Sequence, residues 1–247
     1  MKKVKAYVKW YSPKRPYPLG LIANLQDFAV EIVEDKIGVG EWAIMRRCWE
    51  LGIETDATHI IAFDDDVLLC SDFCDTLLKA LQYRPDNIVE LFGSNADGYL
   101  KPMFERAHTQ HLPWIDQNVH CCGPAIVMPV AMVREFLLWS DRNLWIQSHQ
   151  YGDQAIRFFA QTTGRMISCT VPCLVNQDPN FESTIKGTPH NSKIQACYFA
   201  ADNARAIQWN RDALIVDVGD IRTALWPHQR HFTPGGEVYR RFNLGNA

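Results

Sequence analysis

The feature that most constrains the fold is an apolar run that stops at three adjacent acids, HIIAFDDDV at residues 59–67. β-Branched and aromatic residues in a run this short favour a strand that is covered on both faces. Three neighbouring carboxylates repel one another, so each of them needs water or a partner. The run therefore predicts a buried strand whose carboxyl end carries an acidic triplet, Asp64–Asp66.

The spacing within the acidic triplet favours a metal ion as the partner. Residues two apart on an extended chain point the same way, so Asp64 and Asp66 can face one ion while Asp65 faces elsewhere. Hard divalent cations such as Mg²⁺ and Mn²⁺ prefer carboxylate oxygens. A solvated acidic loop, or a cluster of acids ahead of the next helix, is the alternative interpretation.

The first 93 residues alternate between strand and helix patterns. The expected strands are residues 4–10, 28–33, 60–63 and 87–92, and helices are expected at 19–25, between Gly40 and Gly52, and from Ser71–Asp72, as its N-terminal cap, to Leu81. Such alternation predicts an α/β fold with a mostly parallel central sheet flanked by helices. Ligands of such sheets bind beyond the carboxyl ends of the strands, where the acidic triplet lies.

The second half of the chain is less regular. We expect a long loop over residues 94–118, a strand over 119–128 that Gly123-Pro124 interrupts, and a helix over 130–139. A further helix begins at Gly152 and ends at Gly164, and a strand follows at 166–171. Residues 1–185 are expected to form one catalytic domain, and residues 186–247 an irregular C-terminal extension that packs on it or trails from it.

Composition excludes several classes of protein. The formal net charge of −3 gives no overall basic field for nucleic acid, although residues 1–20 carry six Lys or Arg and no acid. That segment is interpreted as a solvated basic end, with phosphate contact as the alternative. Eight cysteines in mostly apolar contexts are expected to be reduced core residues. Neither a secretory signal nor an apolar stretch of about 18 residues is visible, which predicts a cytoplasmic protein without a transmembrane segment.

Several motifs together resemble the nucleotide-sugar-dependent glycosyltransferases of the GT-A fold. A strand that ends in Asp-x-Asp follows a glycine-containing turn and helix at residues 38–50. Residues 123–129, GPAIVMP, resemble the segment that these enzymes carry near the donor sugar, and Gly152-Asp153-Gln154 resembles their acidic position facing the acceptor. The resemblance covers about residues 1–185 and implies a GT-A-like, Rossmann-like sheet.

The resemblance also implies roles for individual residues. Asp64 and Asp66 would hold Mn²⁺ or Mg²⁺, with Asp178 or His190 as a third ligand, although the family's usual His is missing at that place. Asp153 would be the general base. The residues implied in binding the nucleotide-sugar donor, a UDP-sugar by the same resemblance, are Trp10, Tyr11, Ser12, Arg46, Asp64, Asp65 and Gly123.

Two other functions use the same acids. A metal-dependent nucleotidyltransferase or nuclease also gathers carboxylates, but the chain has no phosphate loop of the G-x-x-x-x-G-K-[ST] type. A non-catalytic sugar-binding module is the third hypothesis. The acceptor stays open among a glycan, a protein, a small molecule and a modified DNA base.

Overall fold

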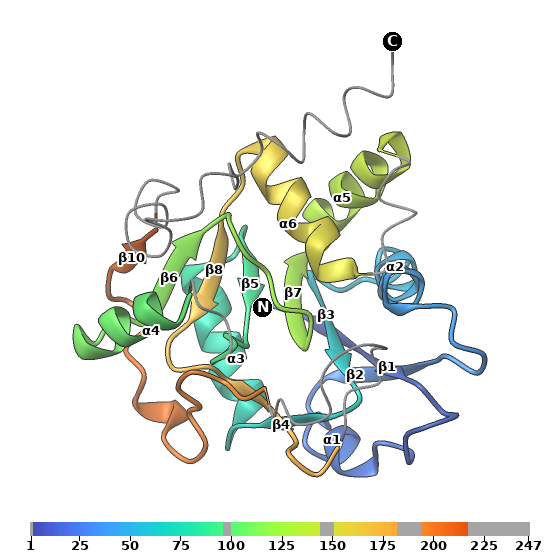
Figure 1. Ribbon diagram of the computed structural model, residues 1–247, viewed down its shortest axis with the longest axis horizontal. Coiled ribbons are helices and arrows are strands. Elements are labelled where there is room, and N and C mark those ends of the chain that lie inside the picture. Colours follow the sequence, from blue (N-terminus) through green and yellow to red (C-terminus); the bar gives the residue numbers. More distant parts are fainter. Residues whose placement is uncertain (1, 96–99, 144–150, 182–193, 217–247) are drawn as a thin grey trace, which may run out of the picture.

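The protein is seen here in a computed structural model that describes residues 2–95, 100–143, 151–181 and 194–216. These residues form an α/β fold around an eight-stranded sheet in the order β10-β6-β8-β5-β7-β3-β1-β2 (Figure 1). The strands of this sheet are β1 Val4–Trp10, β2 Ala29–Glu34, β3 His59–Asp64, β5 Ile88–Glu90, β6 Trp114–Gln117, β7 Ala125–Pro129, β8 Ile167–Thr170 and β10 Ala213–Ile215. A separate antiparallel pair joins β4 Val67–Leu69 to β9 Val175–Gln177.

The central sheet is mostly parallel, as the sequence predicts. Strand β1 runs parallel to both β2 and β3, β5 runs parallel to β8, and β6 runs parallel to β10. Strand β7 lies between β3 and β5 and runs against both of them, and β6 runs against β8. The reversed strand β7 therefore starts at the edge of the sheet where β3 and β5 end.

Helices cover both faces of the sheet and give the fold three layers (Figure 1). One face packs against α2 Glu41–Gly52, α4 Leu100–Thr109, α5 Val130–Arg142 and α6 Gly152–Thr163. The other packs against α1 Leu19–Ala23, α3 Phe73–Tyr83 and the short 3-10 helix η2 Ala204–Ala206. Strand β3 serves both layers, because Ile60 and Ala62 face the first and Ile61 and Phe63 face the second. Burying each large apolar side chain in this way contributes roughly 1.5–3 kcal/mol.

The stretch expected to be a loop, residues 94–118, instead contains α4 and β6. Pro102 lies in the first turn of α4, where a proline is tolerated because its missing N–H has no intrahelical partner. Leu100, Met103, Phe104 and Ala107 are the buried residues of this helix, and they follow helical spacing. The loop prediction was therefore wrong, because the many polar residues of this stretch obscured the helical period of the four apolar ones.

Three further expectations about element ends have different outcomes. Gly164 caps α6 at φ 68°, in the left-handed region that favours glycine, as predicted. Asp72 also has a positive φ, of 53°, but its side chain does not cap α3, and the carboxylate pairs with Arg205 instead. The strand expected over 119–128 begins only at Ala125, so residues 118–124 form a connecting segment.

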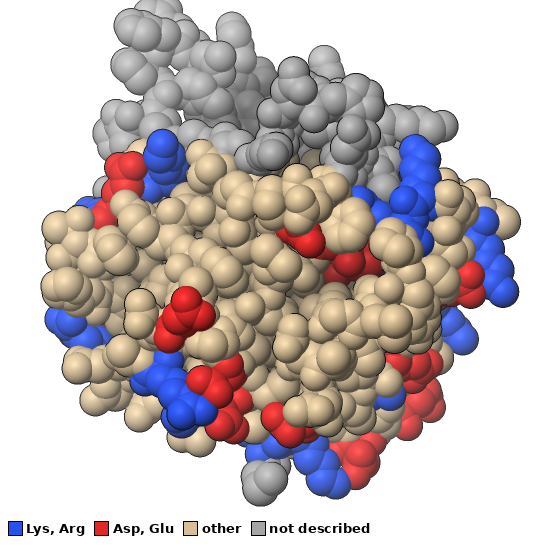
Figure 2. All heavy atoms as spheres, turned by 90° about the horizontal axis from the view of Figure 1, so that it is seen from below, with Lys and Arg blue, Asp and Glu red and all other residues tan. Residues whose placement is uncertain are grey.

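The part of the C-terminal extension that the structure describes, residues 194–216, lies against the same sheet, since β10 pairs with β6. All eight cysteines are free thiols, and seven of them are buried. No helix among the described residues is both long and apolar enough to cross a membrane. Basic and acidic side chains both occur on the face shown in Figure 2, and neither sign forms a continuous patch across it.

Candidate functional site

A buried lysine joins two acids where β1 and β3 end. Lys9 and Asp64 lie side by side in the parallel register of these strands. The Lys9 Nζ atom is 2.7 Å from Oδ1 of Asp64 and 3.0 Å from Oε1 of Glu41, at the start of α2. It also lies 3.5 Å from the carbonyl oxygen of Gly123. The side chain of Lys9 is only 4% exposed, so these groups take the place of water around the ammonium.

The charge state of Lys9 follows from these contacts. Burial alone would lower its pKa, but the carboxylates of Asp64 and Glu41 more than offset this effect and raise the pKa. Lys9 is therefore a permanent cation that holds the end of β3 against the start of α2.

The other two acids of the triplet face Arg15. They lie in the turn between β3 and β4, and Asp66 Oδ2 is 2.7 Å from an Arg15 terminal nitrogen. Asp65 Oδ1 is 3.5 Å from Nε of Arg15, and Asp65 Oδ2 accepts the Tyr11 N–H at 2.9 Å. Arg15 is buried, and its guanidinium packs over the ring of Phe181. The loop after β1 is thus folded onto the acidic triplet.

The acidic triplet still carries excess negative charge. The triplet and Glu41 supply four carboxylates, whereas Lys9 and Arg15 supply two cations, which leaves two negative charges when all the groups are ionised. Burial and then the charge of Asp64 raise the pKa of Asp66 to about 7. The pKa of Asp65 is also raised, chiefly by burial. The donor set and the residual charge both suit a hard divalent cation.

At the acidic triplet, the described residues do not form the geometry of a complete metal site. Among them, neither Asp64 nor Asp66 belongs to a set of three His, Cys, Asp or Glu residues whose ligand atoms all lie within 4.8 Å. The N–H of Asp178 donates to the carbonyl oxygen of Asp66 at 2.7 Å, so Asp178 is beside the triplet, while its own carboxylate accepts bonds from Asn180. His190, the other candidate ligand, lies outside the described residues.

Asp153 lies beside the cluster formed by Lys9, Asp64 and Glu41. The N–H of Gly152 donates to the Glu41 carboxylate, which places the start of α6 against the start of α2. A Cβ atom at Gly123 would lie 3.7 Å from Oδ2 of Asp153 and 3.8 Å from Oε1 of Glu41. Burial and then the charge of Glu41 raise the pKa of Asp153 to about 6. The structure thus brings together the predicted residues Asp64, Gly123 and Asp153.

The remaining predicted donor-binding residues fall into two groups. Trp10, Tyr11 and Ser12 lead into the loop over the triplet, and the Trp10 indole N–H donates to the Arg15 carbonyl oxygen. Arg46 lies elsewhere on α2, where its guanidinium pairs with Glu50 and with Asp141 of α5, both at 2.8 Å. The structure therefore places Arg46 in a link between two helices.

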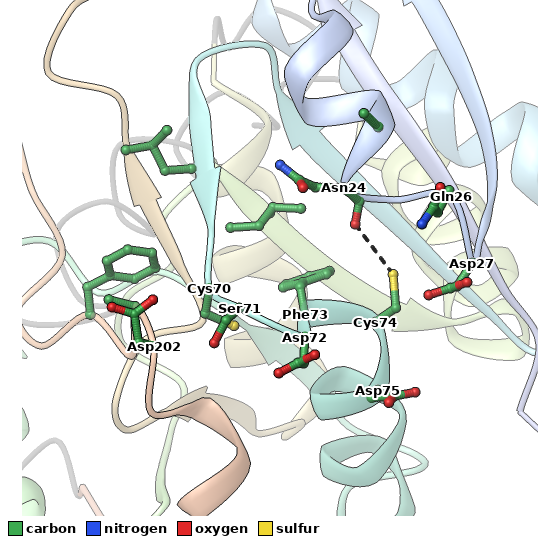
Figure 3. Close-up of a pocket in the computed structure, with 15 residues that line it drawn as sticks. Asn24, Gln26, Asp27, Cys70, Ser71, Asp72, Phe73, Cys74, Asp75 and Asp202 are labelled. Atoms are coloured by element: carbon green, nitrogen blue, oxygen red, sulfur yellow. Dashed lines mark hydrogen bonds between the residues drawn. The ribbon is translucent and has the colours of Figure 1, made fainter.

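Two cavities lie on the side of the sheet that carries α1. A cavity of about 370 Å³ is lined by Arg15, Asp65, Asp178 and Phe181 together with the prolines and aromatic residue of the loop at 16–18. A second, of about 570 Å³, lies between α1, the start of α3 and the segment around Asp202 (Figure 3). Its acids include Asp27, Asp72 and Asp75, and Cys74 Sγ contacts the Asn24 carbonyl oxygen there. Of these two cavities among the described residues, the smaller one borders the acidic triplet.

The sequence interpretation missed three residues of the site: Lys9, Arg15 and Glu41. Lys9 and Arg15 were interpreted as part of a solvated basic end, yet both are buried against the acids. A signal was present, because aligning β1 with β3 as adjacent parallel strands puts Lys9 level with Asp64. Glu41 gave a weaker signal as an acid in the first turn of a helix, where it complements the helix dipole.

No protein-family model matches the chain, and no curated protein matches it. Among solved structures, the chain is similar to A197 from STIV, with a TM-score of 0.40 and 13% identity over 76% of this chain and 100% of that one. It is also similar to S. aureus TarS 1-349 in complex with UDP-GlcNAc, with a TM-score of 0.42 and 11% identity. That match covers 76% of this chain and 60% of the TarS chain, which is less than two thirds of its length.

Proposed function

We propose that the protein is a divalent-metal-dependent glycosyltransferase that moves a sugar from a nucleotide-sugar donor, a UDP-sugar in the first instance, to a hydroxyl group of an acceptor. The observation that carries the proposal is the shared polar cluster at the carboxyl ends of β1 and β3. It combines the acidic triplet and Glu41, whose four carboxylates exceed the cations Lys9 and Arg15 by two charges when all are ionised, with the half-buried carboxyl group of Asp153, whose pKa is raised.

The first requirement of such a reaction is neutralisation of the departing diphosphate. A divalent cation held by Asp64 and Asp66 would supply Lewis-acid stabilisation of that charge. The chain's own contribution is to keep the two carboxylates in place: Lys9 anchors Asp64 and Arg15 anchors Asp66. Trp10, at the end of β1, and Tyr11, just after it, are aromatic residues near this edge that could contact a nucleobase.

The second requirement is removal of the acceptor's proton. Asp153 is our candidate general base for an inverting reaction, since its raised pKa of about 6 lies close to neutral pH. A base whose pKa lies near the working pH combines the ionised form with useful basicity. Gly123 keeps the space beside its Oδ2 free of a side chain, because a Cβ there would approach within 3.7 Å.

The direct test is a panel of nucleotide sugars with and without Mn²⁺, measured by thermal shift and by mass spectrometry of the products. Ligand at 100 times its Kd stabilises by about 2.7 kcal/mol, which corresponds to roughly 5–11 °C for a domain of this size. Asp66→Asn is expected to abolish the metal-dependent part of the shift, and Asp153→Asn to abolish turnover while binding persists. Asp72→Asn is the matched control, because Asp72 is an acid at the start of α3 that pairs with Arg205 and lies outside the triplet.

Two outcomes would redirect the proposal. Release of pyrophosphate in place of a nucleoside diphosphate would support the nucleotidyltransferase alternative. If no nucleotide sugar changes the melting temperature with any divalent ion, and none is hydrolysed, the protein is not the enzyme proposed.

A further inference from the structure

A second group of metal-binding side chains lies at the same edge of the sheet, inside the protein. Glu90, at the end of β5, has no exposed surface although it belongs to a sheet of apolar residues. The ligand atoms of Glu90, His120 and Cys122 all lie within 4.8 Å of one another. Glu90 and Cys122 are buried and His120 is half-buried, so the group reaches the surface only through the histidine.

The distance between the sulfur and the imidazole of this group matches that of a tetrahedral centre. Cys122 Sγ lies 3.6 Å from Nδ1 of His120. Two tetrahedral ligands with zinc–sulfur and zinc–nitrogen bonds of about 2.3 and 2.0–2.1 Å are separated by about 3.5 Å. Cys169 on β8 is the nearest candidate for a fourth donor, because its Sγ lies 3.0 Å from Oε2 of Glu90. It is not within 4.8 Å of all three other ligand atoms, so it would have to move toward His120 and Cys122 to complete the set.

Hydrogen bonds from the backbone and from Gln117 hold these donors in place. The N–H of Cys122 donates to Oε1 of Glu90 at 2.6 Å, which fixes the carboxylate on that side. Oε1 of Gln117 accepts the N–H of His120, and Nε2 of Gln117 donates to the His120 carbonyl oxygen. The backbone that carries His120 is thus tied to a fully buried amide, which limits how far the imidazole can move.

We propose that Glu90, His120, Cys122 and Cys169 form a structural zinc site, separate from the acidic triplet. A donor set of two sulfurs, one imidazole and one carboxylate suits Zn²⁺, whereas Mg²⁺ and Mn²⁺ prefer oxygen donors alone. Binding would release the thiol protons to solvent and replace the hydrogen bond from the Cys169 thiol to Oε2 of Glu90 with an ion–oxygen contact, while the Cys122 N–H keeps its bond to Oε1. Such a site would anchor residues 117–124, the segment that delivers Gly123 to the neighbouring cluster.

This proposal does not rest on the glycosyltransferase proposal, and its test needs no turnover. The full chain, with any affinity tag removed, is passed over a chelating resin and analysed for metals by mass spectrometry. We expect about one zinc per chain. Zinc-free protein titrated with Co²⁺ is expected to develop thiolate-to-cobalt charge-transfer absorption, which ions bound at the acidic triplet cannot produce because the triplet offers only oxygen.

Variants assign the signal to residues. Cys122→Ser and His120→Ala are expected to lower zinc affinity at least tenfold in competition with a chromogenic chelator. Cys74→Ser, a buried thiol packed on the opposite face of the sheet, is expected to bind zinc like the wild type. Circular dichroism checks the fold of each variant, and His120→Ala with the wild-type titration decides the question if Cys122→Ser does not fold.

Three results would overturn the assignment. The first is wild-type protein that holds no stoichiometric zinc and shows no charge-transfer band with Co²⁺, which would leave a hydrogen-bonded core without metal. The second is unchanged affinity in His120→Ala. The third is zinc that disappears in Asp66→Asn and persists in Cys122→Ser, which would place the ion at the acidic triplet.

Discussion

Replacing Lys9 with methionine tests the charge arrangement on which the candidate site depends. Methionine keeps the length and apolar stem of the side chain but removes the ammonium that contacts Asp64 at 2.7 Å and Glu41 at 3.0 Å. Removing one partner of a buried ion pair costs about 3–5 kcal/mol, because the remaining charges are left without compensation. Asp64 and Glu41 are each about a quarter to a third exposed, so we expect the lower end, about 3 kcal/mol.

The assay is urea unfolding followed by tryptophan fluorescence, with thermal unfolding alongside. A loss of about 3 kcal/mol corresponds to a melting temperature roughly 6–12 °C lower for a domain of this size. Lys5→Met is the matched control in the same strand. Lys5 contacts Glu31 at 3.1 Å, but that carboxylate is 44% exposed, and such surface pairs contribute about 0–1 kcal/mol.

The dependence on pH separates electrostatics from packing. Lys9 lowers the pKa of the neighbouring Asp153, so without Lys9 the ionised Asp153 present at pH 8 loses a compensating charge, whereas the protonated Asp153 present near pH 5 does not. The difference in unfolding free energy between variant and wild type should therefore be smaller at pH 5 than at pH 8. Equal losses in Lys9→Met and Lys5→Met, or a loss that does not change with pH, would refute this account of the cluster.

Three further predictions follow from other contacts. Burial and Asp64 raise the pKa of Asp66 to about 7, so below that pH a bound Mn²⁺ must displace a proton from Asp66. The Mn²⁺ affinity measured by calorimetry should therefore fall about tenfold for each pH unit below 7. Constant affinity between about pH 5.5 and 7.5 would contradict the role of Asp66. The pKa of Asp153 is about 6 in the folded protein, compared with an ordinary value of 3.8, so folding favours the protonated form. The unfolding free energy of the wild type should therefore fall relative to Asp153→Asn as pH rises from 4 to 6, by up to about 3 kcal/mol in urea unfolding. A difference between the two proteins that does not change with pH would contradict this prediction. A Cβ at Gly93 would collide with the ring of Phe104, so Gly93→Ala should lose about 1–3 kcal/mol, whereas Gly20→Ala, which meets nothing within 4 Å, should lose no stability.

Much of the fold could be predicted because local patterns and the sheet agree. Strand β1 has the predicted bounds, Val4–Trp10, and α6 ends at Gly164 as expected. In each case one short-range signal suffices: alternation over seven residues for β1, and a glycine that accepts a positive φ for α6. The buried strand β3 was equally clear, since its apolar run is covered on both faces.

Of the charged residues of the site, the acids could be predicted from the sequence and their basic partners could not. The carboxylates could be recognised because three acids are adjacent in the sequence, but their partners Lys9 and Arg15 lie about 50 residues away from them. A lysine on an alternating strand is ordinarily solvated, and only the pairing of β1 with β3 shows that Lys9 faces an acid. The group around Glu90 is harder still, because its four members come from three separate segments and no two have a zinc-ribbon spacing.

The reversal of β7 has a mechanical consequence for both groups of acids. Since this strand starts at the edge where its neighbours finish, the segment just ahead of it passes between the two clusters, with Cys122 bonded to Glu90 and Pro124 accepting the N–H of Asp64. Only Gly123 separates these two anchor points along the chain. A shift of β7 by a single residue would therefore break both of these hydrogen bonds. A ligand that binds at one end of this three-residue segment should accordingly also stabilise the position of the other end.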